Sequence, residues 1–167
     1  GQYPHAAAIM MAKEKLKEKV DTNLLKKQII DKIIKGEYDE HEIKSLEKES
    51  KKLNDKEVLD LLANLFSEWG IAFYELAKSE NDEDLYHQSI EKYEKAVALN
   101  PKSSPIFSNW GLAIYELARL KKNEDLCLQS IEKHEKATAL DPKNGSAFYN
   151  YGLAVYELAR LKNDEDL

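Results

Sequence analysis

The sequence is poor in residues that interrupt helices and in residues that form covalent cross-links. Its 167 residues include four prolines, six glycines and one cysteine, Cys127. One cysteine cannot form a disulfide within the chain, and it offers no thiol pair for a zinc or redox site, so we expect a reducing, cytoplasmic setting. With 43% hydrophobic and 34% charged residues, the composition excludes a disordered or fibrous chain and makes helix the default structure.

Long apolar runs and an excess of basic residues are also missing. The apolar run AAAIMMA, residues 6–12, is too short for a membrane span and passes directly into KEKLKEKV. The net charge is −6: residues 1–62 hold 13 Lys and 13 Asp or Glu, whereas residues 63–167 hold 12 Lys or Arg and 18 Asp or Glu. Because phosphate binding needs clustered cations, we expect no nucleic acid partner. The short apolar run leads us to expect no membrane insertion. The acidic excess favours a neutral or basic partner.

One sequence pattern occurs three times at a constant spacing. It reads FSEWGIAFYELA from Phe66, FSNWGLAIYELA from Phe107 and FYNYGLAVYELA from Phe148, so the period is 41 residues (107 − 66 and 148 − 107). The repeats span residues 66–106 and 107–147, and an incomplete one spans residues 148–167. Residues 1–62 show no such pattern, which predicts two parts, residues 1–62 and 63–167. A fixed period of this length indicates a structural array rather than a catalytic motif.

Hydrophobic spacing predicts two helices in each repeat. In the second repeat, Ile106, Phe107, Trp110, Ile114, Leu117 and Ala118 fall at helical spacings of three and four, and a second set follows at Leu126, Ile131, His134, Ala137 and Leu140. Asn123 is predicted to cap the second helix of this repeat. The counterpart acidic groups at residues 82–84 and 164–166 are predicted to do the same in the other two repeats. Pro101 and Pro142 end that helix, and Pro105 or Gly145 favours a turn after it.

A helical pair of this kind cannot bury its faces alone, so neighbouring pairs must stack. We therefore predict an all-α fold, an α-solenoid of stacked antiparallel helix pairs.

Small and aromatic residues occupy fixed positions in these helices: Phe66, Trp69, Gly70 and Phe73; Phe107, Trp110, Gly111 and Ile114; Phe148, Tyr151, Gly152 and Val155; then Ser89, Tyr93, Ala96 and Pro101; and Ser130, His134, Ala137 and Pro142. This pattern resembles the tetratricopeptide repeat (TPR) over residues 64–167. The resemblance implies a TPR-like superhelix.

The repeat is longer than that of the TPR family, which has about 34 residues. The additional residues lie between the two helices, in ELAKSENDED and its counterparts. Either a longer turn or helices extended by about one turn each would accommodate them. The third repeat reaches Leu167 where its second helix is due, so we expect a fragment of a longer array whose end self-associates readily.

Residues 1–62 are predicted to form three helices, over residues 6–20, 22–35 and 39–53, with the second ending at Gly36. The motif NDKE, residues 54–57, resembles a capping box that opens a further helix from Asp55 to about Lys78. We interpret the segment as an N-terminal helical cap on the array. A tail that docks into a groove, its own or a neighbour's, is the alternative.

No arrangement of residues points to catalysis, and we predict a protein that is not an enzyme and uses no metal or cofactor. The histidines His5, His41, His87 and His134 are scattered, without a second ligand at metal-binding spacing. His134 stands at an aromatic core position and is interpreted as packed. The acidic NDEDL groups lack the pattern of a calcium loop and are explained as helix caps. No histidine is placed to activate Cys127.

The TPR resemblance implies a concave groove lined by the first helices. Its positions, carried over one by one, are Ser67, Ile71, Tyr74 and Glu75; Ser108, Leu112, Tyr115 and Glu116; and Tyr149, Leu153, Tyr156 and Glu157. For Tyr74, Tyr115 and Tyr156, contact with a partner and packing against adjacent helices are equally open interpretations. The three glutamates are expected to be exposed. The cations with which some family members clamp a carboxylate are absent from the matching positions.

These features together predict a non-catalytic adaptor or scaffold. A protein segment that is apolar with basic residues would suit the groove, because apolar contact supplies affinity and charge supplies orientation. A structural protein that assembles with itself through its terminal helices is the alternative from a different class. A regulatory repeat region of a larger protein is a third possibility.

Overall fold

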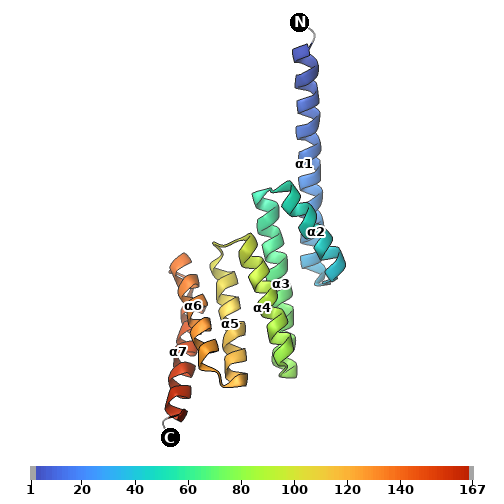
Figure 1. The fold of residues 1–167 in the computed structure, drawn as a ribbon. Helices are drawn as coiled ribbons and strands as arrows, with labels where there is room; N and C mark the ends of the chain where they lie inside the picture. Colours follow the sequence, from blue (N-terminus) through green and yellow to red (C-terminus); the bar gives the residue numbers. More distant parts are fainter. Residues whose placement is uncertain (1–2, 166–167) are drawn as a thin grey trace. The chain divides into compact units, whose positions relative to one another are not determined.

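A computed structural model describes residues 3–165, and the regular structure in this range is entirely α-helical (Figure 1). The helices are α1 (Tyr3–Lys35), α2 (Glu40–Leu53), α3 (Lys56–Glu80), α4 (Glu83–Leu99), α5 (Ser104–Lys121), α6 (Glu124–Leu140) and α7 (Gly145–Glu165). Helix α1 packs on α2, and each of α4, α5 and α6 packs on the helix that follows it, so the prediction of an all-α fold is confirmed. None of the described helices is both long and apolar enough to cross a membrane.

Contacts divide the chain into two compact units, residues 1–62 and 63–167. The three repeats lie in the second unit, and helix α3 begins in the first unit and continues into the second. Each unit buries apolar residues of its own.

Helix α1 is continuous where two helices, over residues 6–20 and 22–35, were predicted. The sequence between Val20 and Asn23 contains no glycine or proline that would break a helix. The Thr22 hydroxyl donates to the Glu18 carbonyl, 2.8 Å away and one turn back in the same helix. The helix ends as predicted at Gly36, which has a φ of 61°.

The first unit is packed around the second half of α1. Leu25 and Ile29 of this half are buried, as are Ile43 and Leu46 of α2, and α1 contacts α2. Ion pairs from Lys32 to Glu42 and from Lys26 to Glu57 add contacts between the helices. By contrast, residues 5–21 are exposed throughout. The first half of α1 therefore depends on its own backbone hydrogen bonds.

The start of α3 differs from the predicted capping box by one residue. Asn54 has a φ of 53° and forms the C-cap of α2, so it is not the first residue of a new cap. The cap of α3 is Asp55, whose carboxylate accepts the Val58 amide at 3.0 Å. Asp39 caps α2 in the same manner, through the Glu42 amide at 2.8 Å, where a helix start was predicted.

The two helices of a repeat are joined by turns of only two residues, so extended helices accommodate the additional residues of the repeat. Asn81 and Lys122 adopt left-handed conformations, with φ of 53° and 50°. The next residues, Asp82 and Asn123, then cap α4 and α6 by accepting the amides three positions on. These two predicted caps are confirmed.

Three other turn predictions are wrong. Asp164, the counterpart of Asn123, lies inside α7 and accepts a hydrogen bond from Arg160 one turn back instead of capping a new helix. Residue 166 of that acidic group lies outside the described residues. Pro105 and Gly145 lie in the first turns of α5 and α7 rather than in the preceding turns. Proline is compatible with this position because the first amides of a helix have no intrahelical partner.

A close contact between a ring and a glycine joins the two helices of each of the first two repeats. A Cβ added at Gly70 would lie 2.9 Å from the Tyr93 ring, and one at Gly111 would lie 2.7 Å from the His134 ring. Only glycine leaves room for this approach. Beside each ring, a buried serine hydroxyl donates 2.7 Å to the carbonyl of the same glycine, from Ser89 to Gly70 and from Ser130 to Gly111.

A lysine on the second helix covers the tryptophan of the first helix in the same repeats. Lys92 Nζ lies 3.9 Å from the centre of the Trp69 ring, and Lys133 Nζ lies 4.3 Å from that of Trp110. The side chain of Lys92 is buried, and its stem packs on the apolar surface while the ammonium group faces the aromatic ring. These contacts recur with the period of the sequence.

Gly152 of the third repeat is equivalent to Gly111 of the second, so alanine substitutions at these two positions can be compared directly. We expect Gly111→Ala to destabilise the protein by about 1–2 kcal/mol, because overpacking against the buried His134 ring outweighs the better helix propensity of alanine. Gly152→Ala meets nothing within 4 Å and should stabilise by about 0.5–1 kcal/mol. Urea unfolding of both variants at low protein concentration measures the difference. Equal effects would show that the ring contact at Gly111 does not constrain the fold.

Candidate protein-binding surface

The structure separates the predicted groove residues by exposure. Five are buried, namely Ser67, Tyr74, Ser108, Tyr115 and Glu157. Partly exposed are Ile71, Leu112, Glu116 and Leu153. Exposed are Glu75, Tyr149 and Tyr156. The accessible part of the predicted site is therefore an aliphatic position in each repeat, two glutamates, and the tyrosines of α7.

Tyr74 and Tyr115 are packing residues rather than open contact positions. The Tyr74 ring meets Tyr86 of α4 edge-on, with the ring centres 6.2 Å apart. Burial raises the pKa of both Tyr74 and Tyr115 above the ordinary value of tyrosine. Tyr156, at the same position of the third repeat, is 68% exposed. Equivalent residues thus have different roles, because helices cover the first two and none of the described helices covers the third.

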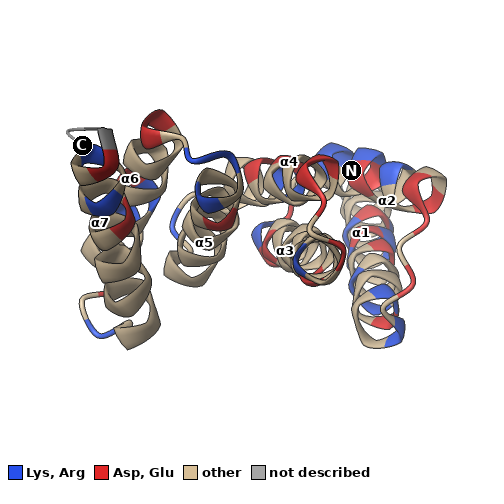
Figure 2. Ribbon diagram, turned by 90° about the horizontal axis from the view of Figure 1, so that it is seen from below, with Lys and Arg blue, Asp and Glu red and all other residues tan. Residues whose placement is uncertain are grey.

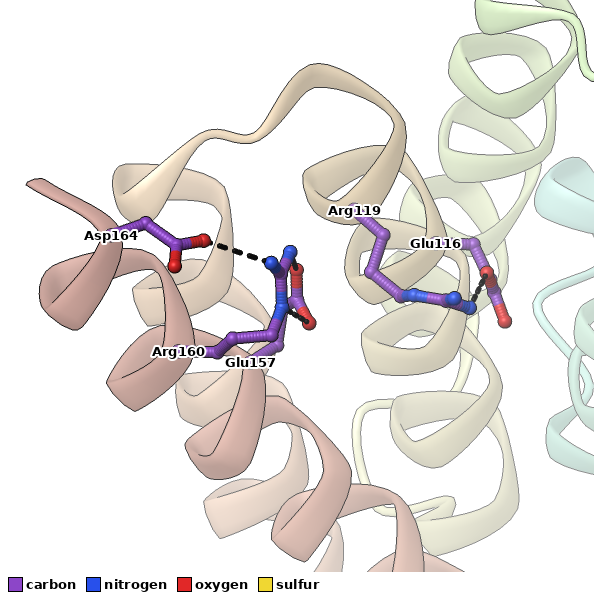
Figure 3. A network of polar contacts seen from close by, with 5 residues as sticks. All are labelled: Glu116, Arg119, Glu157, Arg160 and Asp164. Carbon is purple, nitrogen blue, oxygen red and sulfur yellow. Dashed lines mark hydrogen bonds and ion pairs between the residues drawn. The ribbon is translucent and has the colours of Figure 1, made fainter.

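Glu157 was predicted to be exposed, but this prediction is wrong, because the residue is buried and only 4% exposed. The carboxylate is held from both sides by Arg160, whose Nη2 donates to Oε1 at 2.7 Å and whose Nε donates to Oε2 at 3.1 Å (Figure 3). Hydrogen bonding to Arg160 lowers the pKa of Glu157. A two-point contact with a guanidinium compensates a carboxylate for the water it loses on burial.

A second pair of the same kind lies one repeat earlier. Arg119 Nη1 donates to Glu116 Oε2 at 3.2 Å (Figure 3). The Arg119 guanidinium also lies 5.7 Å from the centre of the Tyr115 ring. In the first repeat Lys78 occupies the position of Arg119, and its Nζ lies 5.9 Å from the Tyr74 ring centre. Each repeat therefore carries a tyrosine, a glutamate and a cation on one helix.

Sequence reasoning missed these cations, although the signal was present. Lys78, Arg119 and Arg160 each follow the repeated glutamate by three residues, in YELAK, YELAR and YELAR. Residues three apart are neighbours on a helix, so an acid and a cation at this spacing are expected to pair. The surface is consequently mixed in charge rather than a row of free carboxylates.

The groups most suited to catalysis are withdrawn from solvent. Cys127 is fully buried, and burial raises the pKa of its thiol to about 11, which keeps it protonated at neutral pH. His134 is also fully buried, and neither ring nitrogen has a hydrogen-bond partner among the described residues. Burial lowers its pKa to about 4. Among residues 3–165, no cluster of three or more His, Cys, Asp or Glu side chains could share a metal ion.

Comparison with known proteins adds no further assignment. No protein-family model matches this sequence, and no curated protein matches it significantly.

The His134 side chain should make stability depend on pH. Its pKa is about 4 when folded and about 6.5 when unfolded, so protons bind the unfolded chain preferentially as the pH falls below 6.5. The stability present above pH 6.5 should fall by roughly 3 kcal/mol by pH 4. His134→Tyr, which installs the ring found at the equivalent Tyr93, should lack this component. Urea unfolding at several pH values measures it, and parallel curves for both proteins would contradict the burial of a neutral histidine.

The two glutamate–arginine pairs should differ in their effect on stability. Arg160→Ala leaves the buried Glu157 without its two-point partner, so we expect a fall in Tm of several degrees. Arg119→Ala is the matched control, because Glu116 still reaches water, and it should lower Tm much less. Thermal unfolding followed by circular dichroism tests this order. A larger effect of Arg119→Ala would contradict the assignment of Glu157 as the buried member.

Proposed function

We propose that this chain is a non-catalytic, TPR-like interaction module that binds a protein segment along its second unit. The observation that carries the proposal is the accessible aliphatic position repeated in three helices, at Ile71 in α3, Leu112 in α5 and Leu153 in α7. These side chains are partly exposed, although each lies on a helix with a buried face. A partner could cover them and gain affinity from apolar contact.

The charged groups beside these residues would orient the partner. Glu75 is exposed, and residues 63–167 carry an excess of acidic residues, which supports a partner with basic residues among apolar ones. Glu116 and Glu157 are engaged by Arg119 and Arg160, so they offer less attraction than three free carboxylates would. We therefore assign the main electrostatic contact to Glu75, with the affinity supplied by the aliphatic positions.

The module would bind with little loss of its own conformational freedom. The two-residue turns and the ring–glycine contacts hold the helices of a repeat in one arrangement before a partner arrives. Preformed surfaces lose less entropy on binding than flexible ones, so a few anchors in each repeat can add up. The buried Cys127 and His134 support a role in binding rather than catalysis.

A peptide selection with matched variants tests this function. Peptides selected from a random library by the full chain should be rich in apolar residues with Lys or Arg nearby. Leu112→Ser should weaken the selected peptide at least tenfold. Leu128→Ser is the control, because Leu128 is exposed on α6 and outside the proposed surface, and it should leave affinity unchanged. No enrichment, or equal effects of the two variants with intact helicity, would contradict the proposal.

Self-assembly is a second candidate function, favoured by one observation. Among the described residues, most exposed large hydrophobic side chains lie on α1 and α7, the first and last helices. Surfaces of this kind mark sites of association in many proteins.

A further inference from the structure

A row of exposed residues runs along α1 with a regular spacing. We call it the α1 seam, and its members are alternately three and four residues apart: Ala6, Ile9, Lys13, Leu16, Val20, Asn23, Lys27, Ile30 and Ile34. All nine are exposed, and the apolar members include Leu16, which is 64% exposed. The seam is therefore an apolar stripe that is interrupted by two lysines and one asparagine.

The α1 seam stays exposed even where α1 is packed against the first unit. Leu25 and Ile29 are buried, and each is two residues away from Lys27. Two residues turn a helix by about 200°, so the seam lies opposite the buried side of α1. Figure 1 shows the first half of α1 extending beyond α2. A partner could thus reach the seam in both halves of the helix.

The spacing of the α1 seam is that of a coiled coil. Alternating steps of three and four residues give a period of about 3.5, and a second helix packs against such a repeat along its length. A helix that lies on a lipid surface presents a broad apolar face instead, without lysines along its midline. Polar residues such as Lys13, Asn23 and Lys27 occur in helix pairs, where they fix the register. The pattern favours a helix as the occupant.

Acidic side chains of α1 lie away from the seam. Both charges occur along α1 (Figure 2). Glu14 and Glu18 are each two residues from Leu16, so they lie on the opposite side of the helix. Asp21 follows Val20 and lies about 100° around the helix from it. The negative charge of the first half of α1 is thus directed to solvent rather than to a partner on the seam.

Lysines dominate the positions that border the seam. The charged residues at these positions are Lys17, Lys19, Lys26 and Asp31. Two of them are engaged elsewhere, because Lys26 pairs with Glu57 and Asp31 pairs with Lys35. A partner would therefore meet the lysines at positions 13 and 27 of the seam and at positions 17 and 19 beside it. Acidic side chains complement this surface.

A second copy of α1 does not provide that complement. Parallel pairing would set Lys13 against Lys13 and Lys27 against Lys27 of the other copy. Antiparallel pairing would still bring together two helices with lysines in and beside the seam. Like charges that face each other across a contact select against the pairing.

We propose that the α1 seam binds an acidic amphipathic helix of another protein as a two-helix coiled coil. Apolar residues of that helix pack on Leu16, Val20 and Ile30, and its Asp or Glu side chains face the lysines. Lys13 and Lys27 are 14 residues apart (27 − 13), which equals two heptads, so the acids that meet them are also two heptads apart. This site lies in the first unit and is independent of the peptide surface proposed for the second.

Fluorescence anisotropy with the full chain and synthetic peptides tests the proposal. The probe is a peptide of about four heptads with Ile and Leu at the inner positions. It carries Glu at the bordering positions and at two inner positions two heptads apart, and its twin carries Lys in place of every Glu. The Glu peptide should bind at least tenfold more tightly than the Lys twin, and more weakly at high salt. No binding of the Glu peptide, or equal binding of both, would overturn the proposal.

Matched variants locate the contact. Leu16→Ser should weaken the Glu peptide at least tenfold, whereas Met11→Ser, at a similarly exposed position outside the seam, should leave its affinity unchanged. Lys13→Glu combined with Lys27→Glu should reverse the preference between the two peptides. Circular dichroism checks that each variant keeps its helicity. Equal effects of the two serine variants, or an unreversed preference, would show that the seam is not the contact.

Two other occupants are separate outcomes of the test. Vesicles rich in phosphatidylserine should not bind the chain through Leu16, and sedimentation of the chain alone should show no association that Leu16→Ser abolishes. Vesicle binding lost in Leu16→Ser would assign the seam to a lipid surface. Self-association lost in the same variant would assign it to a second copy. Either result would overturn the proposal.

Discussion

The second unit depends on the close approach of a ring to a helical glycine. Tyr93 lies against Gly70 and His134 against Gly111, at distances that a Cβ would not allow. This contact brings the helices of a repeat close enough for Ser89 and Ser130 to reach the glycine carbonyls. It also lets Lys92 and Lys133 cover the tryptophans next to these glycines. Removing the space at the glycine would disturb all three contacts together.

Polar contacts as well as apolar packing join α5, α6 and the start of α7. Ser104, at the start of α5, donates to the Ala137 carbonyl of α6 at 2.8 Å and accepts from Asn144 at 2.9 Å. Phe107 packs in the same region with Ala137 and Ala147. Because each helix contacts mainly its neighbours in the chain, stability accumulates locally, as in other helical repeats. Helix α7 contacts α5 and α6 among the described helices, and its Phe148, Tyr149 and Tyr156 side chains are exposed.

The sequence predicted the repeated helices well because periodicity and caps are local signals. Asp82 and Asn123 were identified as caps from residue type and position, and both accept the expected amides. The continuity of α1 was not predicted, because the weak helix formers near Thr22 resemble a helix boundary in the sequence. In the structure the Thr22 hydroxyl donates to the Glu18 carbonyl within the helix. The burial of Glu157 and Tyr115 was not predictable from spacing, since it depends on where the neighbouring helices lie. The partners Arg119 and Arg160 could have been found from their spacing to the glutamates.

The account is tested most directly by native-state hydrogen exchange resolved to single amides. If the ring–glycine contacts organise the second unit, the amides around Gly111 in α5 and around His134 in α6 should open together, with one common free energy, and should be the slowest in the chain. The amides of residues 5–21, which are exposed throughout, should exchange fastest. Independent opening of α5 and α6, or protection of residues 5–21 equal to that of α5, would contradict the central role assigned to this contact.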